Sequence, residues 1–235
     1  MLSYASLTES DTVLEIGPGP GILTEALLNA PIKKLISVEI DYQFWPNLEK
    51  MESNKFSLIK EDALQVPLSN FETPLKIIAN LPYNVGTALI VKWIEQIDSV
   101  SDMVLMLQKE VVDRICAIPR TKDYGRLTIL VQSVCNAKKC FLVSPGNFSP
   151  PPKVDSAVVQ ITPKHHKPFN LIALSNLTKV FFETRRKIVR HALKKLGIDA
   201  ESKILSNIGV DPTMRPEEIT VAQYIEMAVH FEEKL

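Results

Sequence analysis

The sequence predicts an α/β fold: a mainly parallel sheet with helices on both faces, followed by a small C-terminal helical domain. Three observations support this prediction. Short apolar runs alternate with helical stripes of apolar residues over roughly the first 160 residues. A glycine-rich turn, GPGPG, follows the first apolar run. Near the C-terminus the apolar periodicity is helical only.

Five short apolar runs have the length and composition of strands that are buried on both faces of a sheet. In chain order they are Val13–Gly17, Leu35–Ile40, Phe56–Ile59, Lys76–Ala79 and Met103–Leu107. Helical stretches separate or follow these runs, and they are Ile22–Leu28, a helix with Pro46 in its first turn, Thr87–Ile97, Lys109–Ile118 and Arg126–Val134. Two further runs, joined by a proline-rich loop, could close the sheet as an antiparallel pair: Cys140–Ser144 and Ser156–Thr162.

The C-terminal part of the chain has helical spacing throughout. Apolar residues recur at this spacing from Leu171 to Phe181. Thr220 has a capping-box partner, Gln223, at the start of a last predicted helix. The stretch PKHHKP before these helices reads as a linker. We therefore expect two domains, residues 1–165 and residues 166–235.

Composition and charge restrict the class of protein. The 235 residues include 27 basic and 27 acidic side chains, so net charge gives no indication of a nucleic-acid partner. Three cysteines without a C-x-x-C pair favour a reducing compartment and argue against a structural zinc site, and nothing indicates another metal. No apolar run approaches the length of a membrane span, and the N-terminus lacks the features of a signal peptide. We expect a cytoplasmic protein without a membrane partner.

Four consecutive predicted strands each end in residues suited to ligand binding. The first runs into a turn with Gly17 and Gly19, which would let a ligand approach the backbone, although a structural turn is the alternative. The second ends at Glu39, where an acidic side chain accepts hydrogen bonds from ribose hydroxyls. Asp62 follows the third strand, with a turn residue or helix cap as its competing interpretation. Asn80 ends the fourth. Because open α/β sheets bind ligands at the carboxyl ends of their strands, these residues predict a ligand site there.

Two features favour S-adenosylmethionine over a dinucleotide as that ligand. The glycines read G-x-G-x-G rather than G-x-G-x-x-G, and the fourth strand ends in NLPY. Here the sequence resembles the class I adenine-N6 methyltransferases and, among them, the bacterial small-subunit (16S) ribosomal RNA adenine dimethyltransferases. The matching stretches occur in the family's order over nearly the whole chain: VLEIGPGPGILTEALL, VEID, EDAL, NLPYN, LQKEVVDRI, YGRLTILVQ, FSPPPKVDSAVV and ETRRKIVRHAL.

The resemblance implies a Rossmann-like class I methyltransferase sheet that binds S-adenosylmethionine. Gly17 would lie against the methionine part of this cofactor, with Gly19 in the same turn. Glu39 would hold the ribose and Asp62 the adenine amino group, while Asn80 would face the sulfonium. Ionised Glu and Asp side chains only accept hydrogen bonds, which suits hydroxyls and an amino group.

The NLPY stretch carries the predicted target site. An exocyclic adenine nitrogen is a poor nucleophile, because its lone pair is delocalised into the ring. Two acceptors aimed at its N–H groups would make it more reactive: the Asn80 side-chain oxygen, and the carbonyl of Leu81 or Pro82. Pro82 also stiffens the turn, and Tyr83 can stack on a base that has left its helix. By the resemblance, Phe148 packs on the same base; a hydrophobic plug for its loop is the alternative.

A basic cluster in the C-terminal part is the predicted RNA-binding surface. It contains Arg185, Arg186, Lys187 and Arg190, and positions 187, 190 and 194 are expected to share one helical face. Such side chains suit phosphates and supply affinity more than sequence information. A charge run is usually a solvated helix face, but the resemblance favours RNA contact.

The family's N-terminal G-Q-N/H-F-L motif is absent from this sequence, and its first residues, LSYASLTESD, resemble the end of the helix that follows the motif in the family. We expect a monomeric enzyme that dimethylates N6 of two adjacent adenosines near the 3′ end of 16S ribosomal RNA. Its partner would be the small ribosomal subunit or its precursor. Two alternatives are a 23S ribosomal RNA adenine-N6 methyltransferase of the antibiotic-resistance type and a non-catalytic RNA-binding assembly factor.

Overall fold

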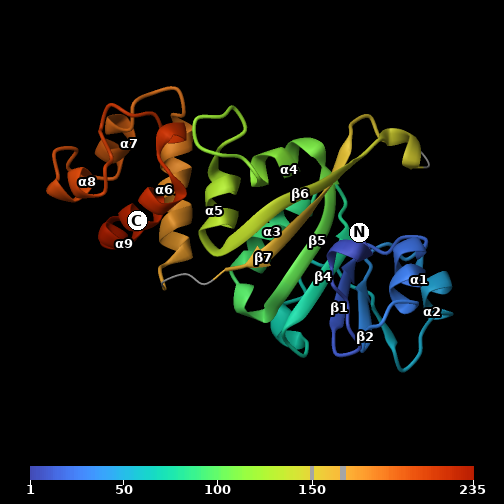
Figure 1. The fold of residues 1–235 in the computed structure, drawn as a ribbon. Coiled ribbons are helices and arrows are strands. Elements are labelled where there is room, and N and C mark those ends of the chain that lie inside the picture. Colours follow the sequence, from blue (N-terminus) through green and yellow to red (C-terminus); the bar gives the residue numbers. More distant parts are fainter. Residues whose placement is uncertain (149–150, 165–167) are drawn as a thin grey trace. The chain divides into compact units, whose positions relative to one another are not determined.

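Figure 1 shows the computed structural model, which describes residues 1–148, 151–164 and 168–235. The chain divides into two units. The first comprises Met1–Val112 and Asn136–Pro163, and the second comprises Asp113–Cys135 and Lys164–Leu235. The segment 113–135, which the sequence places in the first domain, thus groups with the C-terminal part of the chain. The predicted boundary between residues 165 and 166 lies outside the described residues and stays a prediction.

The first unit is built on a seven-stranded sheet with the order β3-β2-β1-β4-β5-β7-β6. The strands are β1 Thr12–Ile16, β2 Lys34–Val38, β3 Phe56–Ile59, β4 Leu75–Asn80, β5 Val100–Gln108, β6 Cys135–Val143 and β7 Ser156–Pro163. Strands β1 to β5 pair in parallel, whereas β7 pairs antiparallel with β5. The chain order reverses between β1 and β4, and open α/β sheets bind ligands at such a point. The predicted α/β sheet is confirmed.

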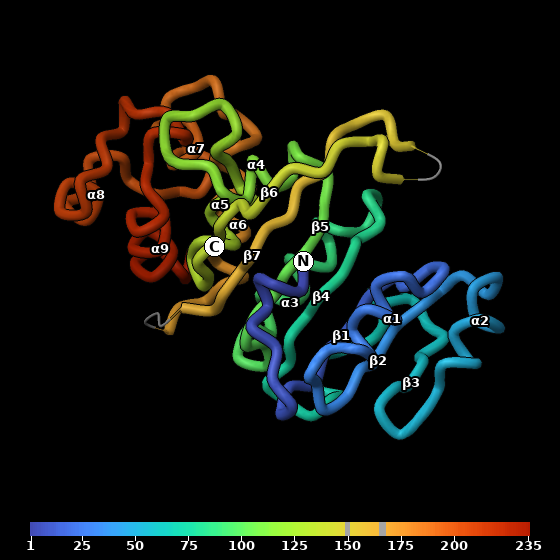
Figure 2. The backbone as a smooth tube through the Cα atoms, turned by 45° about the vertical axis from the view of Figure 1, so that its right-hand side comes forward, coloured from blue at the N-terminus to red at the C-terminus, as the bar shows by residue number. Residues whose placement is uncertain are grey.

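Helices connect the strands of this unit, and the strands share one apolar core. The helices are α1 Ile22–Leu28, α2 Trp45–Glu49 and α3 Gly86–Ile94, with 3-10 helices at Leu2–Tyr4, Leu68–Asn70, Ile97–Ser99 and Pro145–Asn147. Helix α4, Lys109–Ile115, begins in this unit and ends in the second one. The core contains Val13, Leu35, Ile78, Val104 and Val158, one residue from each of five strands. Figure 2 shows the N-terminal residues, in dark blue, passing beside β4 before they enter β1.

The second unit is helical. Its helices are α5 Arg126–Val134, α6 Leu171–Glu183, α7 Arg190–Lys195, α8 Lys203–Asn207 and α9 Val221–His230, with 3-10 helices at Pro216–Glu218 and Glu232–Lys234. Helices α5, α6 and α9 contact one another. Phe181 packs edge-on against Tyr224, with 5.6 Å between ring centroids. The buried hydroxyls of Tyr124 and Tyr224 donate to the carbonyls of Ile219 and Pro216, each at 2.8 Å.

Several predicted elements have the observed bounds, most of the others are shifted by up to three residues at one or both ends, and two predictions differ more. The helix Ile22–Leu28 and the strand Phe56–Ile59 are as predicted, and the Thr220 capping box is confirmed. Strand β6 starts at Cys135 rather than at residue 140. The sequence pattern does not predict its first half, because Asn136, Lys138 and Lys139 are polar and exposed and interrupt any apolar run. The expected helical face of 187, 190 and 194 is wrong for Lys187, which lies in the turn before α7. Within the described residues, no helix is long and apolar enough to cross a bilayer.

Candidate active site

A cavity of about 710 Å³ lies at the carboxyl ends of β1 and β4. This volume is typical of small-molecule and cofactor sites. Six of the sequence-predicted site residues line it: Gly17, Gly19, Asn80, Pro82, Tyr83 and Phe148. Glu39 and Asp62 are not among its lining residues. The structure therefore brings together the glycine turn, the NLPY stretch and the Phe148 loop, which are far apart in the sequence.

The glycine turn after β1 presents bare backbone to the cavity. Gly17 and Gly19 have φ angles of +65° and +54°, a left-handed conformation that costs glycine little. A Cβ on Gly17 would lie 3.5 Å from ring carbons of Pro82, whereas one on Gly19 would have no atom within 4 Å in the part of the chain that the structure describes. The turn thus leaves open space over Gly19 and brings Gly17 close to the NLPY stretch.

Glu15 is a lining residue that the sequence analysis did not identify. Its side chain is fully buried in β1, where Oε2 accepts hydrogen bonds from Thr24 Oγ1 at 2.8 Å and Ser37 Oγ at 2.6 Å. Oε1 is buried and has no hydrogen-bond partner among the described residues. Burial raises the pKa of Glu15 to about 7, although the hydrogen bonds from Ser37 and Thr24 oppose this rise. The sequence does contain a feature that could have identified Glu15 as a site residue: it is the single charged residue in the apolar run VLEI.

The carboxylates of Glu39 and Asp62 bind backbone N–H groups. Glu39 is buried and accepts from Gly19 N–H at 3.0 Å and from Asp41 N–H at 2.8 Å. Asp62 accepts from Leu64 N–H at 2.9 Å, as in a turn. Because a carboxylate offers about four acceptor sites, both residues retain capacity for a ligand. In the described part of the chain, no group of three or more His, Cys, Asp or Glu is arranged to hold a metal ion.

The NLPY stretch is fixed through its backbone. The Leu81 N–H donates to the Met106 carbonyl of β5 at 3.1 Å, and the Pro82 carbonyl accepts from Gly86 N–H at 3.1 Å, at the start of α3. The Asn80 side chain is exposed and has no hydrogen-bond partner among the described residues. The amide that the sequence predicts to contact the target base is thus available to a ligand.

Two aromatic side chains form further walls of the cavity. Tyr83 is 36% exposed, and its hydroxyl lies 2.7 Å from the Oγ of Ser156, a fully buried residue at the start of β7. Phe148 is half-buried, and its N–H donates to the Pro145 carbonyl at 3.1 Å. The predicted pair of aromatic residues therefore borders a single cavity from two separate loops.

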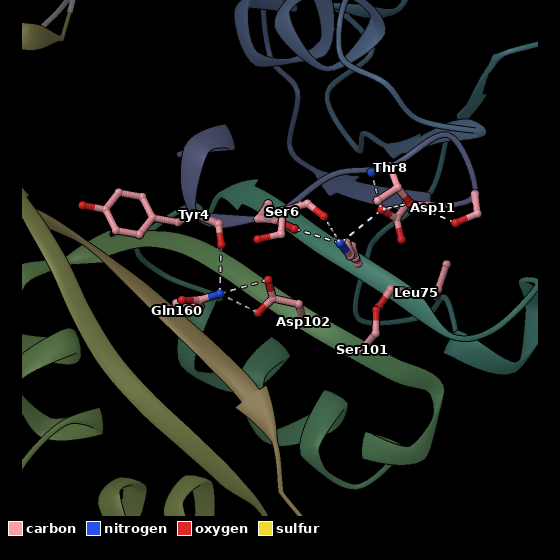
Figure 3. Close-up of polar contacts among 11 residues, drawn as sticks. Tyr4, Ser6, Thr8, Asp11, Leu75, Ser101, Asp102 and Gln160 are labelled. Atoms are coloured by element: carbon pink, nitrogen blue, oxygen red, sulfur yellow. Dashed lines mark hydrogen bonds and ion pairs between the residues drawn. The ribbon is translucent and has the colours of Figure 1, made fainter.

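The segment before β1 also reaches the cavity, through Met1 and Leu2. Figure 3 shows Gln160 of β7 between this segment and Asp102 of β5. Gln160 Nε2 donates to the Tyr4 carbonyl at 2.9 Å and lies 3.3 and 3.2 Å from the two Asp102 carboxylate oxygens. Burial raises the pKa of Asp102, although the hydrogen bond from Gln160 opposes this rise.

Lys76 of β4 also contacts the N-terminal segment. Its ammonium donates to the carbonyls of Ala5 at 2.8 Å and Ser6 at 2.7 Å, and lies 3.1 Å from the Asp11 carboxylate. Only 13% of the Lys76 side chain is exposed, so these are partly buried charge-assisted contacts. Lys76 and Gln160 together fix the backbone that leads from the cavity wall into β1.

The predicted RNA-binding residues divide into two pairs. Arg185 forms an ion pair with Glu217 at 2.7 Å, and Arg190 forms one with Glu201 at 2.8 Å. Arg186 and Lys187 are exposed and form no ion pair within the described residues. The second pair is therefore the more available to a phosphate backbone.

Sequence comparison finds relatives along the whole chain. The family described as "Ribosomal RNA adenine dimethylase" matches residues 1–233. A protein from Rhodospirillum rubrum called "Ribosomal RNA small subunit methyltransferase A" is 42% identical over 226 residues, covering 94% of this chain and 78% of the relative. A protein of the same name from Ehrlichia canis is 40% identical over 234 residues, covering 97% of this chain and 89% of the relative.

Solved structures show the same fold. A dimethyladenosine transferase from Plasmodium falciparum superimposes with a TM-score of 0.83 at 26% identity, covering 99% of this chain and 94% of that one. The 23S rRNA methyltransferase ErmE gives a TM-score of 0.71 at 22% identity, covering 98% of this chain and 94% of that one, which supports the fold alone. The predicted class I methyltransferase fold and the family resemblance are confirmed.

Proposed function

This chain belongs to the ribosomal RNA adenine dimethylase family, and we propose that it dimethylates N6 of two adjacent adenosines near the 3′ end of 16S ribosomal RNA. The substrate would be the small ribosomal subunit or its precursor, in the cytoplasm. The observation that carries the proposal is the convergence of the glycine turn, Asn80, Tyr83 and Phe148 on one cavity. The small-subunit names of the relatives from Rhodospirillum rubrum and Ehrlichia canis favour this RNA over the large-subunit alternative.

The cavity suits S-adenosylmethionine, which supplies a methyl group on a positively charged sulfonium. The buried Oε1 of Glu15, which has no hydrogen-bond partner among the residues that the structure describes, offers an acceptor and a negative charge to the ammonium of the cofactor's amino-acid end. The bare backbone at Gly17 and Gly19 would accommodate the methionine part. We assign Glu39 to the ribose hydroxyls and Asp62 to the adenine amino group, using the acceptor capacity that their turn contacts leave.

Two acceptors would orient the target nitrogen. The Asn80 side-chain oxygen would accept one N–H of the adenine amino group. For the second N–H we assign the Leu81 carbonyl rather than that of Pro82, because the Pro82 carbonyl already accepts backbone N–H groups at the start of α3. Most of the rate acceleration would come from holding this nitrogen in line with the methyl group.

Tyr83 and Phe148 would hold the extruded base by its flat faces. Aromatic rings stack on any base, so these two side chains would contribute binding energy without selecting adenine. Selection would come from the Asn80 oxygen and the Leu81 carbonyl, which accept hydrogen bonds from the amino group. We assign the exposed pair Arg186 and Lys187 to phosphate contacts, with Arg185 and Arg190 beside them in ion pairs.

Transfer of labelled methyl groups to purified, unmethylated small ribosomal subunits tests this proposal. The wild-type chain should label them and should leave large subunits unlabelled. Asn80→Ala should abolish labelling without loss of fold, because it removes an oxygen that contacts the reacting group. Asn84→Ala is the matched control, since Asn84 lies four residues further along the chain, in the turn that follows β4, and does not line the cavity.

The alternatives give different results in the same assay. Labelling of large subunits alone would indicate a 23S enzyme. Retained affinity for precursor small subunits, with no heat of S-adenosylmethionine binding by calorimetry, would indicate a non-catalytic assembly factor. Full activity of the Asn80→Ala variant would refute the role assigned to that amide.

A further inference from the structure

The hydroxyl of Tyr83 is bonded to a residue that does not line the cavity. It lies 2.7 Å from Ser156 Oγ, which is part of a residue with no solvent exposure. We propose that Ser156 is a positioning residue that holds the Tyr83 ring in the orientation in which its face meets the target base. This inference rests on the proposed function, because it concerns the base that Tyr83 is assigned to stack on.

Ser156 is a rigid anchor. It is the first residue of β7 and pairs with Gln108 at the end of β5. The preceding carbonyl, that of Asp155, accepts the Lys109 N–H at 2.9 Å. Backbone pairing between β5 and β7 therefore fixes the position of the Ser156 Cα. A serine side chain then has only one heavy-atom torsion angle, χ1, that can vary.

The Tyr83 ring needs a third point of attachment. The loop that carries it is tied through its backbone at Leu81, by the bond to β5, and at Gly86, by the bond to the Pro82 carbonyl. These bonds fix the two ends of the loop and leave the two side-chain torsions of Tyr83 free. With 36% of the residue exposed, packing covers the ring incompletely. The hydroxyl bond to Ser156 supplies the remaining constraint.

In this geometry the hydroxyl and the ring of Tyr83 have different roles. Because the hydroxyl bonds to Ser156, the ring face is the part that remains for a base. Tyr83→Phe keeps the face and loses the anchor, and Ser156→Ala loses the same anchor from the other side. The two variants should therefore have the same effect, whereas Tyr83→Ala, which removes the face as well, should be more severe.

A double-mutant cycle on methyl transfer to small ribosomal subunits tests this inference. Ser156→Ala and Tyr83→Phe should each lower kcat roughly 3- to 10-fold, as expected for one neutral hydrogen bond. The double variant should be no slower than either single one, because both remove the same bond. The dissociation constant for S-adenosylmethionine should stay unchanged. Ser133→Ala is the matched control, since Ser133 is equally buried and its hydroxyl donates to the Leu130 carbonyl within α5.

Two results would overturn the inference: wild-type kcat in Ser156→Ala, or losses that multiply in the double variant. If Ser156→Ala fails to fold, Tyr83→Phe still decides, because it removes only a hydroxyl from a partly exposed ring. Carbon-13 relaxation of labelled tyrosine rings gives a readout without catalysis. The Tyr83 ring should become more mobile in Ser156→Ala and not in Ser133→Ala, and unchanged mobility counts against the anchor. Failure of wild-type protein to methylate small subunits refutes the proposed function instead.

Discussion

Replacing Glu15 by glutamine should change the pH dependence of stability in a direction that the structure fixes. Burial raises the pKa of this carboxyl from 4.5 to about 7 in the folded chain. Below pH 4.5 the group is protonated in both states. As the pH rises from 4.5 to 7, the unfolded chain releases its proton first, so the free energy of unfolding falls. Above pH 7 both states are ionised and the loss is complete.

The expected magnitude follows from the two pKa values. Each pKa unit corresponds to about 1.36 kcal/mol, so the change from 4.5 to about 7 costs the folded state about 3 kcal/mol at high pH. Glutamine has a similar shape and cannot ionise. The free energy of unfolding of Glu15→Gln, relative to wild type, should therefore rise by about 3 kcal/mol between about pH 4 and about pH 8. Other titrating groups are common to both proteins and cancel in this difference.

Urea unfolding followed by circular dichroism across this pH range measures the difference. Glu25→Gln provides the matched control, because Glu25 is an exposed glutamate on α1 and its replacement should change stability by no more than about 0.5 kcal/mol. A Glu15→Gln difference that does not vary with pH would refute the reasoning that a buried, ionisable carboxylate destabilises the folded state.

Three further predictions concern packing, the N-terminal segment and the RNA surface. Gly86→Ala places a Cβ 2.6 Å from Leu107 Cδ2 and should lower the free energy of unfolding by about 1–3 kcal/mol in urea titrations. Gly146→Ala, whose new Cβ would have no atom of the described residues within 4 Å, should be nearly neutral. Lys76→Met leaves two carbonyls and a carboxylate without their cation; it should cost about 2–3 kcal/mol in the same titrations and speed amide exchange before β1. Arg186→Ala should weaken binding to small-subunit RNA and reduce the slope of log affinity against log salt by about 0.7–0.9, as for one phosphate contact; an unchanged slope contradicts that contact.

Local sequence patterns predict the turn and strand ends that line the cavity, but not the long-range hydrogen bonds that hold its side chains and backbone in place. The glycine turn and the NLPY stretch could be predicted because turn chemistry and strand ends are encoded in consecutive residues. The bond from Tyr83 to Ser156 joins residues 73 apart, and that from Gln160 to Tyr4 joins residues 156 apart. Such pairs depend on the register of β7 against β5, which no local periodicity specifies. The predicted bounds of β6 are too short for a different reason: polar residues interrupt the first half of this strand, so it carries no apolar run.

Glu15 connects the stability of the fold to its proposed ligand. A cost of about 3 kcal/mol is large beside the total stability of a typical domain, about 5–15 kcal/mol. A cation beside Oε1 would remove this cost, because an adjacent positive charge lowers the pKa of a carboxyl. Binding of S-adenosylmethionine should then release up to about half a proton near pH 7, where the free Glu15 side chain is half protonated. Calorimetry in two buffers of different ionisation enthalpy measures that proton, and Glu15→Gln should release none. Proton-neutral binding to the wild-type chain would mean that the ammonium lies away from Glu15, while the assignments of Asn80 and the glycine turn would still stand.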